Sequence, residues 1–99
     1  MIRHAALFRL NHAPGSKEEA AFLEATATLA SIRGVESFEI ARETSPKNEY
    51  TFAVSMTFAD QAAYDAYNGH PSHVAFVRDR WIPEVAAFME HDTVKLEPR

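Results

Sequence analysis

The segment YTFAVSMTF, which runs from Tyr50 to Phe58, has the clearest secondary-structure pattern in this sequence. Every second side chain in it is large and apolar, and the side chains between them are small or polar. Alternation with a period of two is typical of a β-strand that buries one face in a hydrophobic core. We therefore expect a sheet with one buried face, whose other strands and cover come from the rest of the chain.

Three other segments have strand character. Residues Ile2 to Leu10 alternate well enough to place an apolar face on the same core. Residues Val35 to Arg42 form a second strand, and a polar connection at 44–48 joins it to the central segment in the manner of a hairpin. The segment from Thr93 to Leu96 is short, and we expect it to close the sheet as the last strand.

The segments between these strands carry helix signals. Ser16 and Glu19 have the S-x-x-E spacing of a capping box, which predicts a helix that begins near Lys17 and ends at Gly34. Asp60 is suited to cap a short second helix. The proline at position 71 fits the first turn of a further helix to about residue 81, and the proline at 83 bends or restarts it.

This order of elements predicts an α+β domain of β-α-β-β-α-β plan, with helices on one face of an antiparallel sheet. The 99 residues form one such domain, residues 1–99, without an internal repeat. The helices leave the second sheet face uncovered. That face carries the small or apolar residues Ala5, Leu7, Ala53, Ser55 and Thr57. We therefore expect a homodimer that packs through the sheet face.

The composition excludes several classes of protein. The sequence contains no cysteine, which excludes disulfides, thiol nucleophiles and zinc-thiolate sites. Ten Lys and Arg stand against fourteen Asp and Glu, with no basic cluster, so nucleic acid is not an expected partner. No apolar stretch reaches the roughly 18–20 residues that span a membrane, and no secretory leader is visible. We expect a cytoplasmic protein that binds neither nucleic acid nor membrane.

The five histidines differ in their surroundings. His12 lies in a polar turn, where a solvated imidazole without a role is expected. His91 fits as a cation near the C-terminal end of a helix. His4 differs from these because the strand pattern points it into the apolar face. It is either a core histidine satisfied by one hydrogen bond or a polar group that faces a cavity.

Tyr67 and His73 flank the break between the last two helices, and that break can turn both side chains toward one space. A phenol and an imidazole that share a pocket form a general acid/base pair, in which the imidazole lies near its working pH. The alternative for Tyr67 is a boundary tyrosine with an apolar body and a solvated hydroxyl.

The sequence contains no clear pattern for a metal or cofactor site. His70 and His73, with Asp79 or Glu84, have a spacing that a metal site could use, but Pro71 disturbs the helical geometry that such a site needs. The sequence has no phosphate-binding glycine loop, no dinucleotide fingerprint and no nucleophile elbow. We therefore expect no cofactor and no metal.

Three stretches resemble the stress-responsive A/B barrel domain family, abbreviated Dabb: MIRHAALFRL (1–10), SPKNEYTFAVSMTF (45–58) and AYNGHPSHVAF (66–76). The resemblance spans essentially the whole chain, and its most specific element is the H-P-x-H-x-x-F pattern from His70 to Phe76. It implies a ferredoxin-like fold in which two sheets pack face to face, so that a homodimer forms an α+β barrel.

The resemblance also implies site residues. Proteins of this family include plant stress proteins, uncharacterised bacterial proteins and a polyketide cyclase, olivetolic acid cyclase. By resemblance to that cyclase, His73 is the catalytic base and Tyr67 assists it, without a cofactor, in a pocket between sheet and helices. The residues that then bind the substrate are His4, Phe8, Phe22, Val54, Met56 and Phe76.

The sequence departs from the cyclase at the pocket. Asn68 and Gly69 replace a bulkier aliphatic pair, and Ala6 replaces a larger side chain, so a cavity here differs in shape. One hypothesis is a dimeric barrel that binds a small apolar oxygenated ligand, with cyclase- or lyase-type acid/base chemistry by His73 and Tyr67. The other is a non-enzymatic stress-response or structural dimer. Heme or quinol oxidation, known from other dimeric ferredoxin-like barrels, rests on fold analogy alone.

Overall fold

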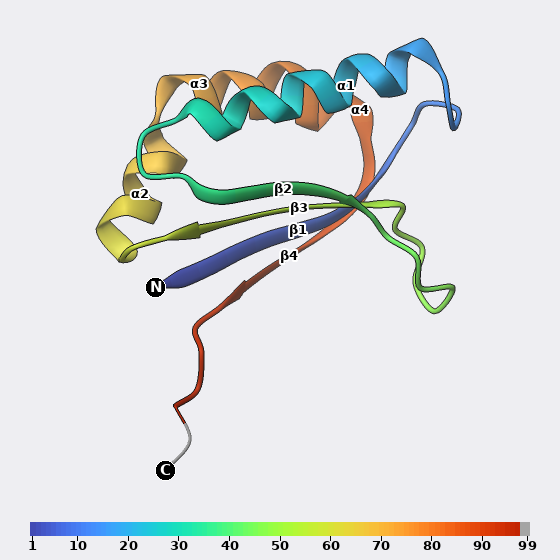
Figure 1. The fold of residues 1–99 in the computed structure, drawn as a ribbon. Helices are drawn as coiled ribbons and strands as arrows, with labels where there is room; N and C mark the ends of the chain where they lie inside the picture. Colours follow the sequence, from blue (N-terminus) through green and yellow to red (C-terminus); the bar gives the residue numbers. More distant parts are fainter. Residues whose placement is uncertain (98–99) are drawn as a thin grey trace.

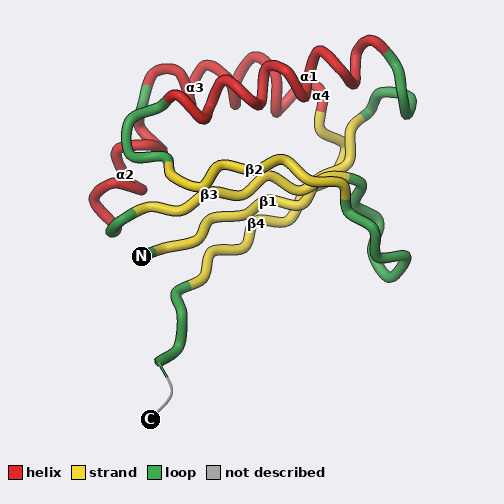
Figure 2. The backbone as a smooth tube through the Cα atoms, in the orientation of Figure 1, coloured by secondary structure: helices red, strands yellow, loops and turns green. Residues whose placement is uncertain are grey.

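Four strands form one sheet, and the helices cover one of its faces, in the computed structural model, which describes residues 1–97 (Figure 1). The elements in chain order are β1 (Ile2–Leu10), α1 (Lys17–Ala27), η1 (Thr28–Ser31), β2 (Glu36–Arg42), β3 (Phe52–Phe58), α2 (Gln61–Gly69), α3 (Pro71–Phe76), η2 (Val77–Trp81), α4 (Ile82–Glu84) and β4 (Val85–Thr93). Figure 2 shows the helices in red on one side of the yellow strands. The predicted α+β, ferredoxin-like plan is confirmed.

The sheet has the strand order β2-β3-β1-β4, and every neighbouring pair is antiparallel. Residues that lie opposite each other in such a pair share one face of the sheet. On the face toward the helices, His4 lies opposite Met56 and Ala6 lies opposite Val54. All four side chains are buried, so the alternation that predicted the central strand does set its buried face.

The first helix forms as its capping residues predict. The Ser16 hydroxyl accepts a hydrogen bond from the backbone N–H of Glu19, and the Glu19 carboxylate accepts one from the N–H of Gly15. Helix α1 passes into the 3₁₀ turn η1, and the chain then reverses at Gly34. The φ of Gly34 is +93°, a left-handed value that favours glycine and that ends the helical segment.

The second helical segment is broken at His70. Asp60 caps α2 by accepting a hydrogen bond from the N–H of Ala63, and the His70 imidazole accepts one from the N–H of Ser72 at the start of α3. Pro71 occupies the first turn of α3, where its missing N–H costs nothing. Helix α3 continues into η2, a π-helical turn that ends at Trp81.

The prediction for the last strand was wrong. Residues Thr93 to Leu96 were expected to form it, but β4 runs from Val85 to Thr93, and residues 94–97 have no regular structure. The strand begins directly after Glu84, where the short helix α4 that contains Pro83 ends, and it pairs with most of β1. His91 therefore lies opposite Ala5 in the sheet and not at a helix end.

The sheet face away from the helices carries few charged groups at its centre. Leu7 on β1 lies between Ala53 of β3 and Met89 of β4, and Ala5 lies between Ser55 and His91. Met89 is 47% exposed, so this face presents apolar surface. Within residues 1–97, no helix is long and apolar enough to cross a membrane.

Candidate functional site

A cavity of about 420 Å³ lies between the sheet and the helices. Its lining includes the sequence-predicted residues His4, Val54, Met56, Tyr67, His73 and Phe76. Ala6, where the sequence departs from the cyclase, also lines it, and the lining residues that the sequence did not single out are Thr26, Leu29, Val77, Trp81, Ile82, Val85, Phe88 and Glu90.

Phe8 and Phe22 do not line the cavity, although the resemblance implied it. Both are fully buried, and their ring centroids lie 5.7 Å apart in the aromatic core. Trp81 stands between this core and the cavity, since its ring centroid is 5.1 Å from that of Phe8 and its side chain also lines the cavity. Phe8 and Phe22 therefore pack behind Trp81, which forms part of the cavity wall.

His73 lies on α3 with its imidazole half-buried. Its Nδ1 is 3.2 Å from the carbonyl oxygen of Asn68, which can only accept a hydrogen bond, so Nδ1 carries the proton. In the neutral ring, Nε2 is then the unprotonated nitrogen. Burial lowers the pKa of His73 below its ordinary value, and the neighbouring His4 lowers it further. The neutral, basic form of His73 is thus the main species at neutral pH.

Tyr67 lies against His73, with 4.4 Å between the ring centroids. Its side chain is almost fully buried, and within residues 1–97 no protein group accepts a hydrogen bond from its hydroxyl. Burial raises the pKa of Tyr67, and the negative charge of Glu90 raises it further. The phenol therefore stays protonated and can donate a hydrogen bond to a ligand.

His4 belongs to a network that the sequence did not reveal. Its Nδ1 donates to the carboxylate of Asp92 over 2.6 Å, and the Tyr64 hydroxyl donates to the other oxygen of that carboxylate over 2.7 Å. The Tyr64 hydroxyl also lies 2.9 Å from Nδ1 of His4. Because Nδ1 of His4 is held in this way, the second ring nitrogen, Nε2, is left for the cavity that His4 lines.

Asp92 is the shared acceptor of this network. Burial on its own raises the pKa of a carboxyl, but the hydrogen bonds from His4 and Tyr64 outweigh it and hold the pKa of Asp92 below its ordinary value. The pairing of β1 with β4 brings residues 4 and 92 opposite each other. No local pattern predicts such a contact, which is why Asp92 and Tyr64 were missed.

Replacing Asp92 by Ala should destabilise the protein by about 1–3 kcal/mol, because two buried donors lose their acceptor. A carboxyl with a depressed pKa in the folded state stabilises the fold above its unfolded pKa, so this contribution is lost as the pH falls below about 4. Urea unfolding at pH 7 and pH 2.5 measures both effects. The Asp65→Ala variant, on the exposed side of α2, is the control. Equal stability of Asp92→Ala and wild type at pH 7 would contradict the assignment.

The prediction that His12 is a solvated imidazole was wrong. Its side chain is only 22% exposed, and its Nε2 lies 2.7 Å from the carboxylate of Glu84, which also pairs with Arg80. The backbone N–H of Asn11 donates to the carbonyl of Glu84 as well. These contacts tie the turn after β1 to the start of β4, away from the cavity, so their role is structural.

The two histidines of the HPSH segment make separate contacts with the backbone. Nδ1 of His70 accepts from the backbone of Ser72, while Nδ1 of His73 donates to Asn68, so the two rings serve different helix ends. Across residues 1–97 there is no group of three or more His, Cys, Asp or Glu side chains placed to hold a metal ion.

Comparisons with known proteins show the family and the fold of this chain. The family model described as Stress responsive A/B Barrel Domain matches residues 2–95. A Dabb family protein with a ferredoxin-like fold from Mesorhizobium loti is 58% identical, with a TM-score of 0.94 and coverage of 97% of each chain. A dimeric ferredoxin-like protein of unknown function from Thermobifida fusca is 25% identical, with a TM-score of 0.78 and coverage of 95% of this chain and 90% of its own.

A more distant structural neighbour is a hydroxynitrile lyase from Passiflora edulis. It is 14% identical, with a TM-score of 0.85, and the alignment covers 99% of this chain and 95% of the lyase. At this identity the likeness is one of fold alone. A comparison with the curated proteins gives no match.

Proposed function

We propose, from the premise that this chain belongs to the stress-responsive A/B barrel domain (Dabb) family, that its cavity binds a small, largely apolar molecule with a carbonyl or hydroxyl oxygen. The observation that supports this most is that one apolar cavity of about 420 Å³ is lined by His4, Tyr67 and His73 together. Cavities of this size, with apolar walls and a few polar groups, are typical small-molecule sites.

The chemistry that we propose is acid/base catalysis of the lyase or cyclase type without a cofactor. Nε2 of His73 takes a proton from the carbon next to the ligand carbonyl, and the C–H electron pair moves to form the enolate. The Tyr67 hydroxyl donates a hydrogen bond to the enolate oxygen. In a cyclase reaction the enolate carbon then bonds to a second carbonyl carbon of the ligand, whose C=O π electrons move to its oxygen, and that oxygen takes the proton from His73, so no oxidant or reductant is consumed. The Passiflora neighbour, which shares the fold, is described as a hydroxynitrile lyase, and this supports a reaction of the lyase type.

An exchange assay tests the proposal without knowledge of the natural substrate. The protein is incubated in D₂O with 4-phenyl-2-butanone, a ketone with an apolar body, and NMR follows the replacement of the protons next to the carbonyl. We expect faster exchange than in buffer alone. Saturable binding without exchange would retain the binding function and remove the catalytic one. Absence of both, across ketones of graded length, would favour the non-enzymatic, structural dimer.

The uncovered sheet face supports a homodimer. Leu7, Ala53 and Met89 form an apolar row across three strands, and nothing within residues 1–97 covers it. A domain of 99 residues buries only a modest core, so burial of this row adds stability that the single chain lacks. The Thermobifida fusca neighbour is described as dimeric, which agrees with this proposal.

Replacing Leu7 by Arg should convert the dimer to a monomer, because the substitution buries an unpaired charge at the centre of the apolar row. Light scattering coupled to size exclusion measures the mass, which should fall from twice 11.1 kDa to 11.1 kDa. Ala30→Arg, on the exposed surface of η1, adds the same charge and should leave the dimer intact. A wild-type mass of 11.1 kDa would refute the dimer outright.

A further inference from the structure

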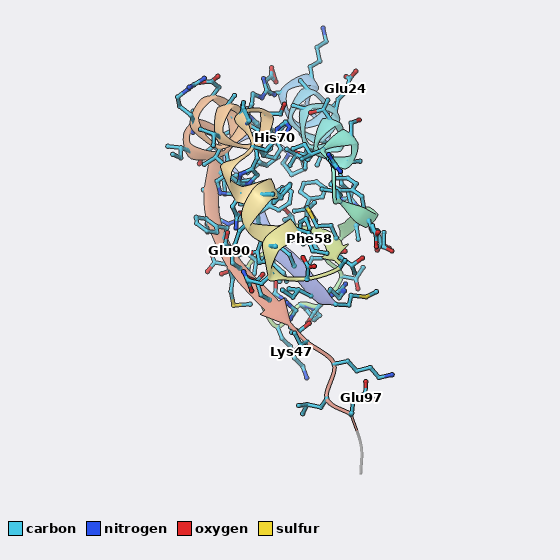
Figure 3. The ribbon with its side chains drawn as sticks, turned by 90° about the vertical axis from the view of Figure 1, so that its left-hand side faces the viewer. Glu24, Lys47, Phe58, His70, Glu90 and Glu97 are labelled. Carbon is cyan, nitrogen blue, oxygen red and sulfur yellow. The ribbon has the colours of Figure 1, made fainter. Side chains whose placement is uncertain are left out.

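Glu90 gives the cavity a negative charge that no protein group balances. The strand pairing places Glu90 opposite Ala6, which lines the cavity, so Glu90 faces the helices and lines the same cavity. Figure 3 labels it on β4, which is one of the two edge strands of the sheet. Within residues 1–97, its carboxylate has no hydrogen bond or ion pair, and no lysine or arginine lines the cavity.

Neither imidazole that lines the cavity pairs with Glu90. Burial lowers the pKa of His73, so this ring is neutral at neutral pH. The ring of His4 points its Nδ1 at Asp92, and the carboxylate of Asp92 accepts that hydrogen bond. Glu90 is exposed, and its negative charge adds to the effect of burial in raising the pKa of both Tyr64 and Tyr67.

Aromatic rings surround the same space. Tyr67, Phe76, Trp81 and Phe88 all line the cavity, and Trp81 and Phe88 meet edge to face with 5.5 Å between ring centroids. The face of an aromatic ring attracts a cation, and tryptophan does so most strongly. Aromatic walls together with one unpaired carboxylate attract a positively charged group and repel a second carboxylate.

We propose that the ligand of this cavity carries an organic cation, such as a protonated amine, on its apolar body, and that Glu90 and the aromatic walls select for it. The inference rests on the proposed binding function and adds the charge of the ligand to it. It also excludes simple carboxylic acids as favoured ligands. Glu90 acts here as a specificity-determining residue, and it does not itself donate or accept the proton in the acid/base chemistry assigned to His73 and Tyr67.

Three compounds with one apolar body and different head groups test the inference: 4-phenylbutylamine, 4-phenylbutanol and 4-phenylbutyrate. Trp81 is the single tryptophan of the chain and lines the cavity, so its fluorescence, excited where a phenyl group does not absorb, reports binding. We expect the amine to bind about tenfold more tightly than the alcohol, and the butyrate to bind more weakly than the alcohol.

The Glu90→Gln variant should bring the affinity for the amine to within about twofold of that for the alcohol, and thermal unfolding of the variant checks that its fold is intact. Glu24→Gln removes the same charge from the exposed surface of α1 and should leave the order of affinities as in wild type (Figure 3). An amine preference that survives in Glu90→Gln would overturn the role of Glu90.

The two levels of the proposal fail in different ways. If the alcohol binds wild type and the amine binds no more tightly, the cation inference is wrong and the binding function remains. If none of the three compounds changes the fluorescence of Trp81, the cation inference falls together with the binding of a small apolar ligand.

Discussion

Replacing His73 by Gln should reduce the protein-dependent exchange of the ketone protons by about a hundredfold, to near the rate in buffer, because the cavity loses its base. Gln keeps a hydrogen-bond donor for the carbonyl of Asn68, so the helix junction should hold. Binding of the ketone itself should change little. NMR gives the exchange rate, and thermal unfolding checks the fold.

The pH dependence provides a second signature of the same group. The base form of His73 is needed, and burial places the pKa of His73 below the ordinary value of about 6.5. The exchange rate should therefore fall only as the pH drops through this lowered pKa, and should be level through pH 7. His70→Asn is the matched control, because His70 does not line the cavity and Asn also caps a helix well. Full exchange activity in His73→Gln would rule out His73 as the base.

Replacing Phe22 by Ala should lower the free energy of unfolding by about 3–5 kcal/mol, because a fully buried ring is removed and its space cannot refill. The ring centroid of Phe22 lies 5.7 Å from those of both Phe8 and Phe76. A small domain has only about 5–15 kcal/mol of stability in total, so the loss is severe.

Urea unfolding at one fixed protein concentration measures this loss, since the stability of a dimer depends on concentration. The control is Phe88→Ala, the same substitution at a ring that is 51% exposed at the edge strand. It should cost less than about 1.5 kcal/mol. A loss below about 2 kcal/mol for Phe22→Ala would mean that the ring is not packed as described.

Local patterns predicted the parts of the fold that local physics decides. The strand at the centre of the sheet and the cap of α1 depend on neighbouring residues, and both are found where the sequence places them. The last strand was misplaced because two of its inward residues, Glu90 and Asp92, are polar. Polar residues on an inner face hide the alternation that identifies a strand.

The site residues that belong to a sequence motif were predicted. Those that strand pairing brings together from distant parts of the chain were missed. Tyr67 and His73 are in contact across a helix break, and Pro71 indicates that break in the sequence. The contact of His4 with Asp92 spans nearly the whole chain, and the pairing of β1 with β4 that creates it has no local signal. The alternation predicted which face of the sheet Phe8 occupies. It could not predict that the cavity does not extend as far as the Phe8 ring.

The π-helical turn at Val77–Trp81 affects the alignment of this chain with any relative that has a regular α-helix at this point. Such a turn holds one residue more than an α-helical turn, so a relative with a regular helix here is one residue shorter between His73 and β4. An alignment without a gap at this point slips β4 by one position, and a one-residue slip exchanges the two faces of a strand. Glu90 would then be matched with a residue that faces away from the cavity. In such an alignment the gap should be placed inside the π-helical turn. Its position decides which carboxylates of the two proteins are compared.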